Sequence, residues 1–152
     1  MKFISAILFN FLVVHALSAQ SNANEWPLFR GKSDLAGKIE FELTAAPSLL
    51  WSIKTGSATK SSPVISEGTV YFGNDKGALI AVGTDSRIKW KYEARESIDA
   101  APMVIGNKVI FGASDGILRA VDKISGKLIW SYTTDTRLQV QQMCGLRVIN
   151  RE

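Results

Sequence analysis

The feature that most constrains this chain of 152 residues is an internal repeat of about 40 residues. Sliding the sequence against itself by 39 positions superposes identical residues at Pro63/Pro102, Val70/Val109, Phe72/Phe111, Gly73/Gly112, Gly77/Gly116, Leu79/Leu118, Ala81/Ala120 and Val82/Val121. One extra residue in a turn of the second copy then aligns Trp90 with Trp130, and Trp51 lies 39 positions before Trp90. A period of about 40 residues made of short strands is typical of β-propeller blades.

Short apolar or alternating runs predict four strands in each copy of the repeat. The predicted strands are 63–66, 69–73, 78–82 and 87–93 in the first copy, and 102–105, 108–112, 117–122 and 127–132 in the second. Turn residues separate them. The run 78–82 is wholly apolar, which indicates a sheet covered on both faces.

Before the first copy, Leu49, Trp51 and Ile53 alternate with their neighbours and predict one closing strand. We therefore expect an all-β partial propeller over residues 49–135. It should hold two four-stranded antiparallel blades, at about 61–93 and 100–132, plus that closing strand.

The segment from Ala120 to Trp130 resembles the tryptophan-docking motif of pyrroloquinoline-quinone-type, or quinoprotein-like, propellers. Its Ala, Asp, Gly, Lys and Trp stand at the spacing Ala-x-Asp-x-x-Thr-Gly-Lys-x-x-Trp, with Ser125 in place of the threonine. The first copy is one residue shorter and lacks the Asp and the Gly. The resemblance covers about residues 25–135, and it extends to the propeller of the outer-membrane-protein assembly machinery.

In this family the motif alanine makes room for an indole from an adjacent motif. The resemblance therefore implies a set of structural docking residues: Trp51, Trp90, Trp130, Ala81, Ala120, Gly126 and Asp122. We interpret the tryptophans as wedges between blades and Asp122 as a turn-bonding residue; the alternative is that the indoles stack on carbohydrate. Trp130→Ala should then cost a few kcal/mol by opening a cavity.

The two ends of the chain differ from the repeats. Residues 1–23 have a positive start, a short apolar run and small-residue cleavage sites at Ala19 and Ala23, which predicts a secretory signal peptide rather than a retained anchor. Residues 24–48 should be an irregular N-terminal segment, and 136–152 a non-repeat tail. We interpret the chain as a truncated or frame-shifted propeller; the alternative is that other chains complete the ring.

The residue types present restrict the possible chemistry. The single histidine, His15, lies in the predicted signal, so the mature chain is expected to lack histidine-dependent catalysis and histidine-bound metals. The single cysteine, Cys144, can form no intramolecular disulfide. Asp75 and Asp115 are interpreted as turn residues, with calcium binding or acid–base chemistry as the alternative. We predict no catalytic, cofactor-binding or metal residues and no cofactor.

The net charge of +4 is mild, and Arg87, Lys89 and Lys91 are interpreted as a solvated strand face, so nucleic acid is not an expected partner. We expect a non-catalytic binding or scaffold protein, exported to the periplasm, the cell envelope or the exterior, with a role in envelope or outer-membrane protein assembly. Other proteins would bind at its sheet edges and inter-blade grooves.

Self-association is also expected, because surface such as Val70, Phe72, Val109 and Phe111 would lie partly in water. The alternative function is a fragment of a pyrroloquinoline-quinone-dependent dehydrogenase. By resemblance, such an enzyme holds the quinone at the ring centre with calcium, an aspartate base and often an adjacent pair of cysteines.

Overall fold

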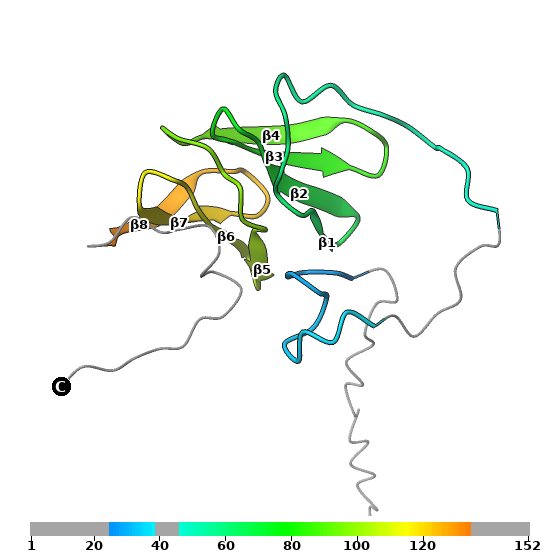
Figure 1. Ribbon diagram of the computed structural model, residues 1–152, viewed down its shortest axis with the longest axis horizontal. Helices are drawn as coiled ribbons and strands as arrows, with labels where there is room; N and C mark the ends of the chain where they lie inside the picture. The colour runs from blue at the N-terminus through cyan, green and yellow to red at the C-terminus, as the bar shows by residue number, and fades with distance from the viewer. Residues whose placement is uncertain (1–24, 39–45, 135–152) are drawn as a thin grey trace, which may run out of the picture.

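The computed structural model describes residues 25–38 and 46–134 (Figure 1). Its elements are eight strands: β1 (Val64–Ser66), β2 (Thr69–Gly73), β3 (Ala78–Gly83), β4 (Ile88–Glu93), β5 (Met103–Ile105), β6 (Lys108–Gly112), β7 (Ile117–Asp122) and β8 (Leu128–Thr133). They form two four-stranded antiparallel sheets in the orders β1-β2-β3-β4 (blade 1) and β5-β6-β7-β8 (blade 2). This confirms the two predicted blades. The predicted signal peptide and tail lie outside the described residues.

The repeat extends to the irregularities of the two sheets. In blade 1 the pairing of β3 with β4 shifts between Ala81 and Val82, and in blade 2 the pairing of β7 with β8 shifts between Ala120 and Val121. Such a bulge bends the strand and increases its twist. In each blade the alanine just before the shift pairs with the recurring tryptophan of the next strand, so a small side chain stands opposite a large one.

The main core lies between the two blades, which pack face to face. Blade 1 contributes buried residues that include Val64, Tyr71, Leu79, Ala81 and Trp90, and blade 2 contributes Val104, Val109, Phe111 and Val121. The expectation that Val109 and Phe111 lie partly in water is wrong, since they are 0% and 1% exposed. They belong to the inner face of blade 2, which blade 1 covers.

A second cluster covers the other face of blade 1. Phe72 is 9% exposed there, against the expectation, while Val70 is half-buried. Trp51 and Ile53 pack over this cluster. They do so from an irregular segment, so the prediction of a closing strand at residues 49–53 is wrong. A strand needs a hydrogen-bonding edge beside it, and the segment lies on the face of blade 1 and pairs with no edge within the described residues.

The N-terminal segment lies beside the inner edges of both sheets (Figure 1). Trp26 and Ile65 of β1 exchange two backbone hydrogen bonds of 2.8 Å, and the N–H of Val104 in β5 donates to the carbonyl of Pro27 at 2.7 Å. Within the described ranges, the outer strands β4 and β8 therefore keep the free sheet edges. The part of the chain that the structure describes contains no helix with the length and apolar character of a membrane span.

Candidate binding surface

The contact between Trp90 and the β7–β8 turn shows how one blade docks on the next. The indole Nε1–H of Trp90 donates to the carbonyl of Lys123 at 3.0 Å. Its ring lies over Gly126, where an added Cβ would come within 2.7 Å of two ring carbons. Gly126 also has φ +69°, a conformation that glycine adopts without strain. The close approach of the blades at this point therefore requires glycine.

Asp122 holds that turn in shape. Its Oδ1 accepts hydrogen bonds from the backbone N–H groups of Ile124 (3.2 Å) and Ser125 (2.8 Å) and from the Ser125 hydroxyl (2.7 Å). The hydrogen bonds from Ser125 keep the pKa of Asp122 below its ordinary value. In blade 1 the corresponding turn begins at Gly83, and the residue with positive φ is Ser86, at 67°. Of these two turns, only the one in blade 2 thus has a glycine against which an indole can pack.

Two further groups at the blade interface were not predicted from the sequence. The first is the carbonyl of Lys123, which also accepts a long bond from the Tyr71 hydroxyl at 3.5 Å. The Lys123 ammonium lies 2.7 Å from Glu67 of blade 1. No sequence pattern marks Lys123, because its interaction with Trp90 uses a backbone atom that every residue has.

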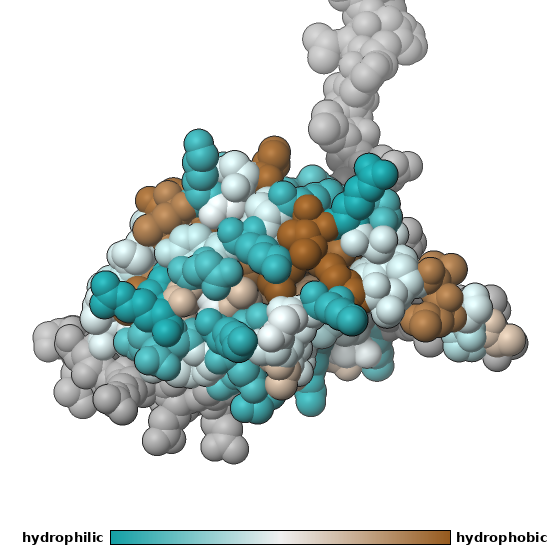
Figure 2. Space-filling model, turned by 90° about the horizontal axis from the view of Figure 1, so that it is seen from above, coloured by the Kyte–Doolittle hydropathy of each residue, from teal (hydrophilic) through white to brown (hydrophobic). Residues whose placement is uncertain are grey.

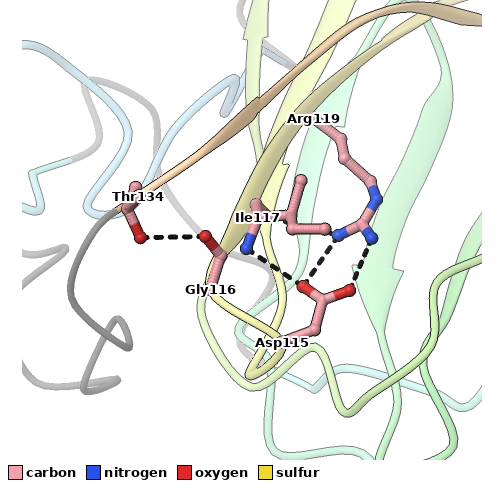
Figure 3. A network of polar contacts seen from close by, with 5 residues as sticks. All are labelled: Asp115, Gly116, Ile117, Arg119 and Thr134. Carbon is pink, nitrogen blue, oxygen red and sulfur yellow. Dashed lines mark hydrogen bonds and ion pairs between the residues drawn. The ribbon is translucent and has the colours of Figure 1, made fainter.

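The second missed group is an ion pair at the blade interface, shown in Figure 3. Arg119 is 6% exposed, and both of its terminal nitrogens pair with the carboxylate of Asp115, which also accepts the N–H of Ile117 at 3.0 Å. Hydrogen bonding from Arg119 lowers the pKa of Asp115, and the same bond raises the pKa of Arg119. The sequence does contain one sign of this ion pair: Arg119 stands at the repeat position that Ile80 occupies in blade 1.

The outward face of blade 2 repeats the docking face of blade 1 but remains open. In blade 1 the row Val64, Tyr71, Ala81 and Trp90 is buried against blade 2. The matching row in blade 2 pairs in the same register and, with the neighbouring Leu118–Tyr132 pair, makes up what we call the open face: Met103, Ile110, Leu118, Ala120, Trp130 and Tyr132. Trp130 is 37% exposed, against 9% for Trp90, and Tyr132 is 65% exposed.

The predicted docking residues therefore lie in three places. Trp90, Ala81 and Gly126 meet between the blades, with Asp122 in the adjoining turn. Trp51 packs on the outer face of blade 1, while Trp130 lies beside Ala120 on the open face. The wedge role of Trp130 stays a prediction for an assembly in which something covers the open face. The loss of stability predicted for replacing Trp130 is expected instead for replacing Trp90, which the described structure encloses.

The remaining surface is mixed in character. Figure 2 shows hydrophobic side chains in several separate patches, with hydrophilic side chains between them. Exposed apolar residues outside the open face include Leu49, Leu50, Ile105 and Ile124. Among the residues that the structure describes, no group of three or more His, Cys, Asp or Glu side chains is placed to hold a metal ion.

The chain matches a family of known sequences. Residues 38–149 match the family described as "Outer membrane protein assembly factor BamB". The chain is also 36% identical over 85 residues to the DNA damage-responsive serine/threonine-protein kinase RqkA of Deinococcus radiodurans, which is 55% of this chain and 13% of that protein. It is 32% identical over 82 residues to the quinoprotein alcohol dehydrogenase PedH of Pseudomonas putida, covering 47% of this chain and 14% of that protein. The chain thus spans only about a seventh of these relatives.

Solved structures of low sequence identity share the fold. BamB from Moraxella catarrhalis superposes with a TM-score of 0.56 at 24% identity, over 60% of this chain and 29% of that one. The quinohemoprotein alcohol dehydrogenase of Comamonas testosteroni gives 0.66 at 22% identity, over 75% and 20%. A europium-containing methanol dehydrogenase gives 0.64 at 18% identity, over 76% and 24%. The two blades accordingly share the fold of the β-propeller blades in these proteins.

Proposed function

The chain belongs to the outer membrane protein assembly factor BamB family, and on that premise we propose that it is an exported, non-catalytic propeller module that binds other proteins. Its place of action would be the periplasm or the cell envelope. Its role would be in the assembly of envelope or outer-membrane proteins. Family membership supports the kind of role, and the surface of blade 2 supports the kind of partner.

The observation that carries the proposal is the exposure of Trp130 and Tyr132 on the open face. All of its six residues are uncharged, and two of them are large aromatic side chains that water reaches. Aromatic residues are enriched in the cores of protein interfaces and charged residues are depleted there. Removing apolar surface from water contributes about 25 cal/mol per Å², so covering this face with a partner is favourable.

An unfolded outer-membrane protein is a partner of suitable chemistry. Its strands alternate apolar and polar residues, so one side of an extended segment can lie on an apolar sheet face. The free edges of β4 and β8 add unpaired backbone groups, to which an extended segment can also bind. Protein binding would thus rest on the open face, with a sheet edge as an additional site wherever that edge is unoccupied.

The test measures binding of a fluorescently labelled, unfolded outer-membrane β-barrel protein, diluted from urea, to the full chain by anisotropy. Trp130→Ser/Tyr132→Ser should weaken binding at least about tenfold, since roughly 1.4 kcal/mol corresponds to that factor. The matched control is Ile105→Ser/Ile124→Ser, which removes two exposed apolar side chains outside the open face and should leave the affinity unchanged. Equal affinities for all three proteins, or no binding by the parent, would overturn the proposal.

A fragment of a pyrroloquinoline-quinone-dependent dehydrogenase is the second candidate. The similarity to PedH and the superposition on the Comamonas enzyme favour it. The described residues supply no cluster of carboxylates of the kind that a calcium-assisted quinone site needs, so we assign no step to such a cofactor. Reconstitution with the quinone and calcium, followed by dye reduction with a primary alcohol, distinguishes the two functions. We expect no reduction above buffer, and clear activity would favour the enzyme.

A further inference from the structure

The two outer strands occupy equivalent places in the two blades but differ sharply in charge. When Trp90 is aligned with Trp130, Lys89, Lys91 and Glu93 of β4 fall at equivalent positions of the repeat. In β8 these positions are occupied by Ile129, Ser131 and Thr133. Strand β4 therefore has a charge at every second position, whereas β8 has none. Every residue of β8 is exposed, and Ile129 is 43% exposed.

The difference decides which edge can pair with another strand. A free edge presents unpaired N–H and C=O groups, and charged side chains, lysine above all, are the usual protection against pairing with another chain. Lys89 and Lys91 give β4 this protection. Strand β8, with the sequence Leu-Ile-Trp-Ser-Tyr-Thr, lacks it and is rich in residues that favour strands.

We propose that β8 pairs in antiparallel fashion with β8 of a second copy of this chain, giving a closed two-fold dimer. Pairing of β4 with β4 would bring lysines opposite one another, and like charges directly opposite are destabilising. Pairing of β4 with β8 would set the charged residues of β4 beside uncharged residues of β8, which offer them no opposite charge. Only β8 with β8 meets no charge, and identical surfaces that meet about a two-fold axis close after two copies.

The two-fold axis also fixes which registers are allowed. Side chains alternate between the faces of a strand, and an axis perpendicular to the sheet keeps each face on its own side, so only residues of one face can stand opposite each other. The register that sets Ser131 opposite Ser131 of the second copy places Trp130 opposite the other Tyr132, which gives two cross-strand aromatic pairs. In it the two open faces join into one continuous surface, so the dimer occupies the β8 edge but leaves the open face available for the proposed protein binding, on which it does not depend.

The first test is the molar mass of the full chain, measured by light scattering during gel filtration at micromolar concentration. The parent should be a dimer, and Ile129→Lys/Ser131→Lys, which gives β8 the lysine pattern of β4, should be a monomer with unchanged near-ultraviolet circular dichroism. The control Ile105→Lys/Ile124→Lys adds the same charge at exposed sites outside β8 and should remain a dimer. A monomeric parent, or a β8 lysine variant that stays dimeric, would overturn the proposal.

The second test reads the register by oxidation in a Cys144→Ser background. Ser131→Cys should form an intermolecular disulfide, because residue 131 meets its own copy across the axis. Directly opposed Cβ atoms are roughly 4.5 to 5.5 Å apart, and small movements of the paired edge strands bring them to the about 3.5 to 4.5 Å that a disulfide needs. Thr133→Cys should remain largely reduced, because residue 133 would face Ile129. Equal crosslinking of the two variants would contradict this register. All these variants keep Trp130 and Tyr132, so a loss of dimerisation is separable from a loss of protein binding.

Discussion

Gly126 and Trp90 set how closely the two blades approach. The ring lies so near the Gly126 backbone that a methyl group there would overlap it at 2.7 Å, and the indole also donates to the Lys123 carbonyl. A packed interior has no spare volume to absorb such an overlap. Substitutions at either residue should therefore affect the whole interface.

We predict that Gly126→Ala lowers the free energy of unfolding by about 2 to 4 kcal/mol, through overpacking together with left-handed backbone strain. Urea unfolding followed by tryptophan fluorescence measures it. Gly106→Ala is the matched control, because Gly106 also has positive φ, 55°, but no atom within 4 Å of the added Cβ. It should show the backbone strain alone, and equal losses at the two positions would argue against the contact with Trp90.

Trp90 and Trp130 should differ strongly although they occupy the same repeat position. Trp90→Ala should cost about 3 to 5 kcal/mol, the usual range for a buried aromatic. Trp130→Ala should cost clearly less, because Trp130 is 37% exposed and its removal opens no enclosed cavity in the described structure. Thermal melts of the two variants provide the comparison. A larger loss for Trp130 would mean that the open face is covered in solution.

The buried pair of Asp115 and Arg119 makes a prediction about pH. Its hydrogen bond from Arg119 lowers the folded pKa of Asp115, so the carboxylate stabilises the fold fully above its unfolded pKa of about 3.9. This contribution is lost as the pH falls through the lower, folded value. Asp115→Asn should thus be less stable than the parent by about 3 to 5 kcal/mol at pH 7, and the difference should shrink below about pH 4.

Unfolding in urea across this pH range tests the prediction, with Asp85→Asn as the control. Asp85 and Arg87 also form an ion pair, but their side chains are 61% and 87% exposed, and exposed pairs contribute little. The control should match the parent at every pH. A difference for Asp115→Asn that does not change with pH would show that lost packing, rather than charge, accounts for it.

Among the strands, the central ones of each blade should open last. Strands β2, β3, β6 and β7 are hydrogen-bonded on both sides, while β4 and β8 are outer strands of their sheets. Local opening follows burial and backbone protection, so amides of these four central strands should exchange slowest. Hydrogen–deuterium exchange of the monomeric β8 lysine variant checks this without interference from dimerisation. If β8 exchanged as slowly as β7 there, another segment would have to pair with its edge.

The strands themselves could be predicted to within one residue from the sequence. Each is a short apolar or alternating run between turn residues, and both signals are local. The segment at 49–53 shows the limit of this approach. Leu49, Trp51 and Ile53 have the alternation of a strand, but a strand also needs a neighbouring edge, and no local pattern reports whether one is present.

At the scale of the whole molecule, the sequence could not show which face of each sheet is covered. Phe111 and Trp130 are both apolar residues of blade 2, but the first is 1% exposed and the second 37%, because they point to opposite sides of the same sheet. Arg119 was missed for the related reason that its partner Asp115 lies in a turn, where aspartate has an ordinary structural use. Which face is covered depends on which blade packs against which, and a pattern along the sequence does not contain this.

The central claim is that blade 2 presents an open aromatic face on which other proteins bind. Hydroxyl-radical footprinting of the full chain, alone and with the unfolded outer-membrane protein, tests it most directly. Trp130 and Tyr132 should be oxidised several-fold faster than Trp90 and Tyr71, and the added protein should slow the oxidation of the first pair only. Equal oxidation of all four residues, or protection that spares Trp130 and Tyr132, would contradict the account.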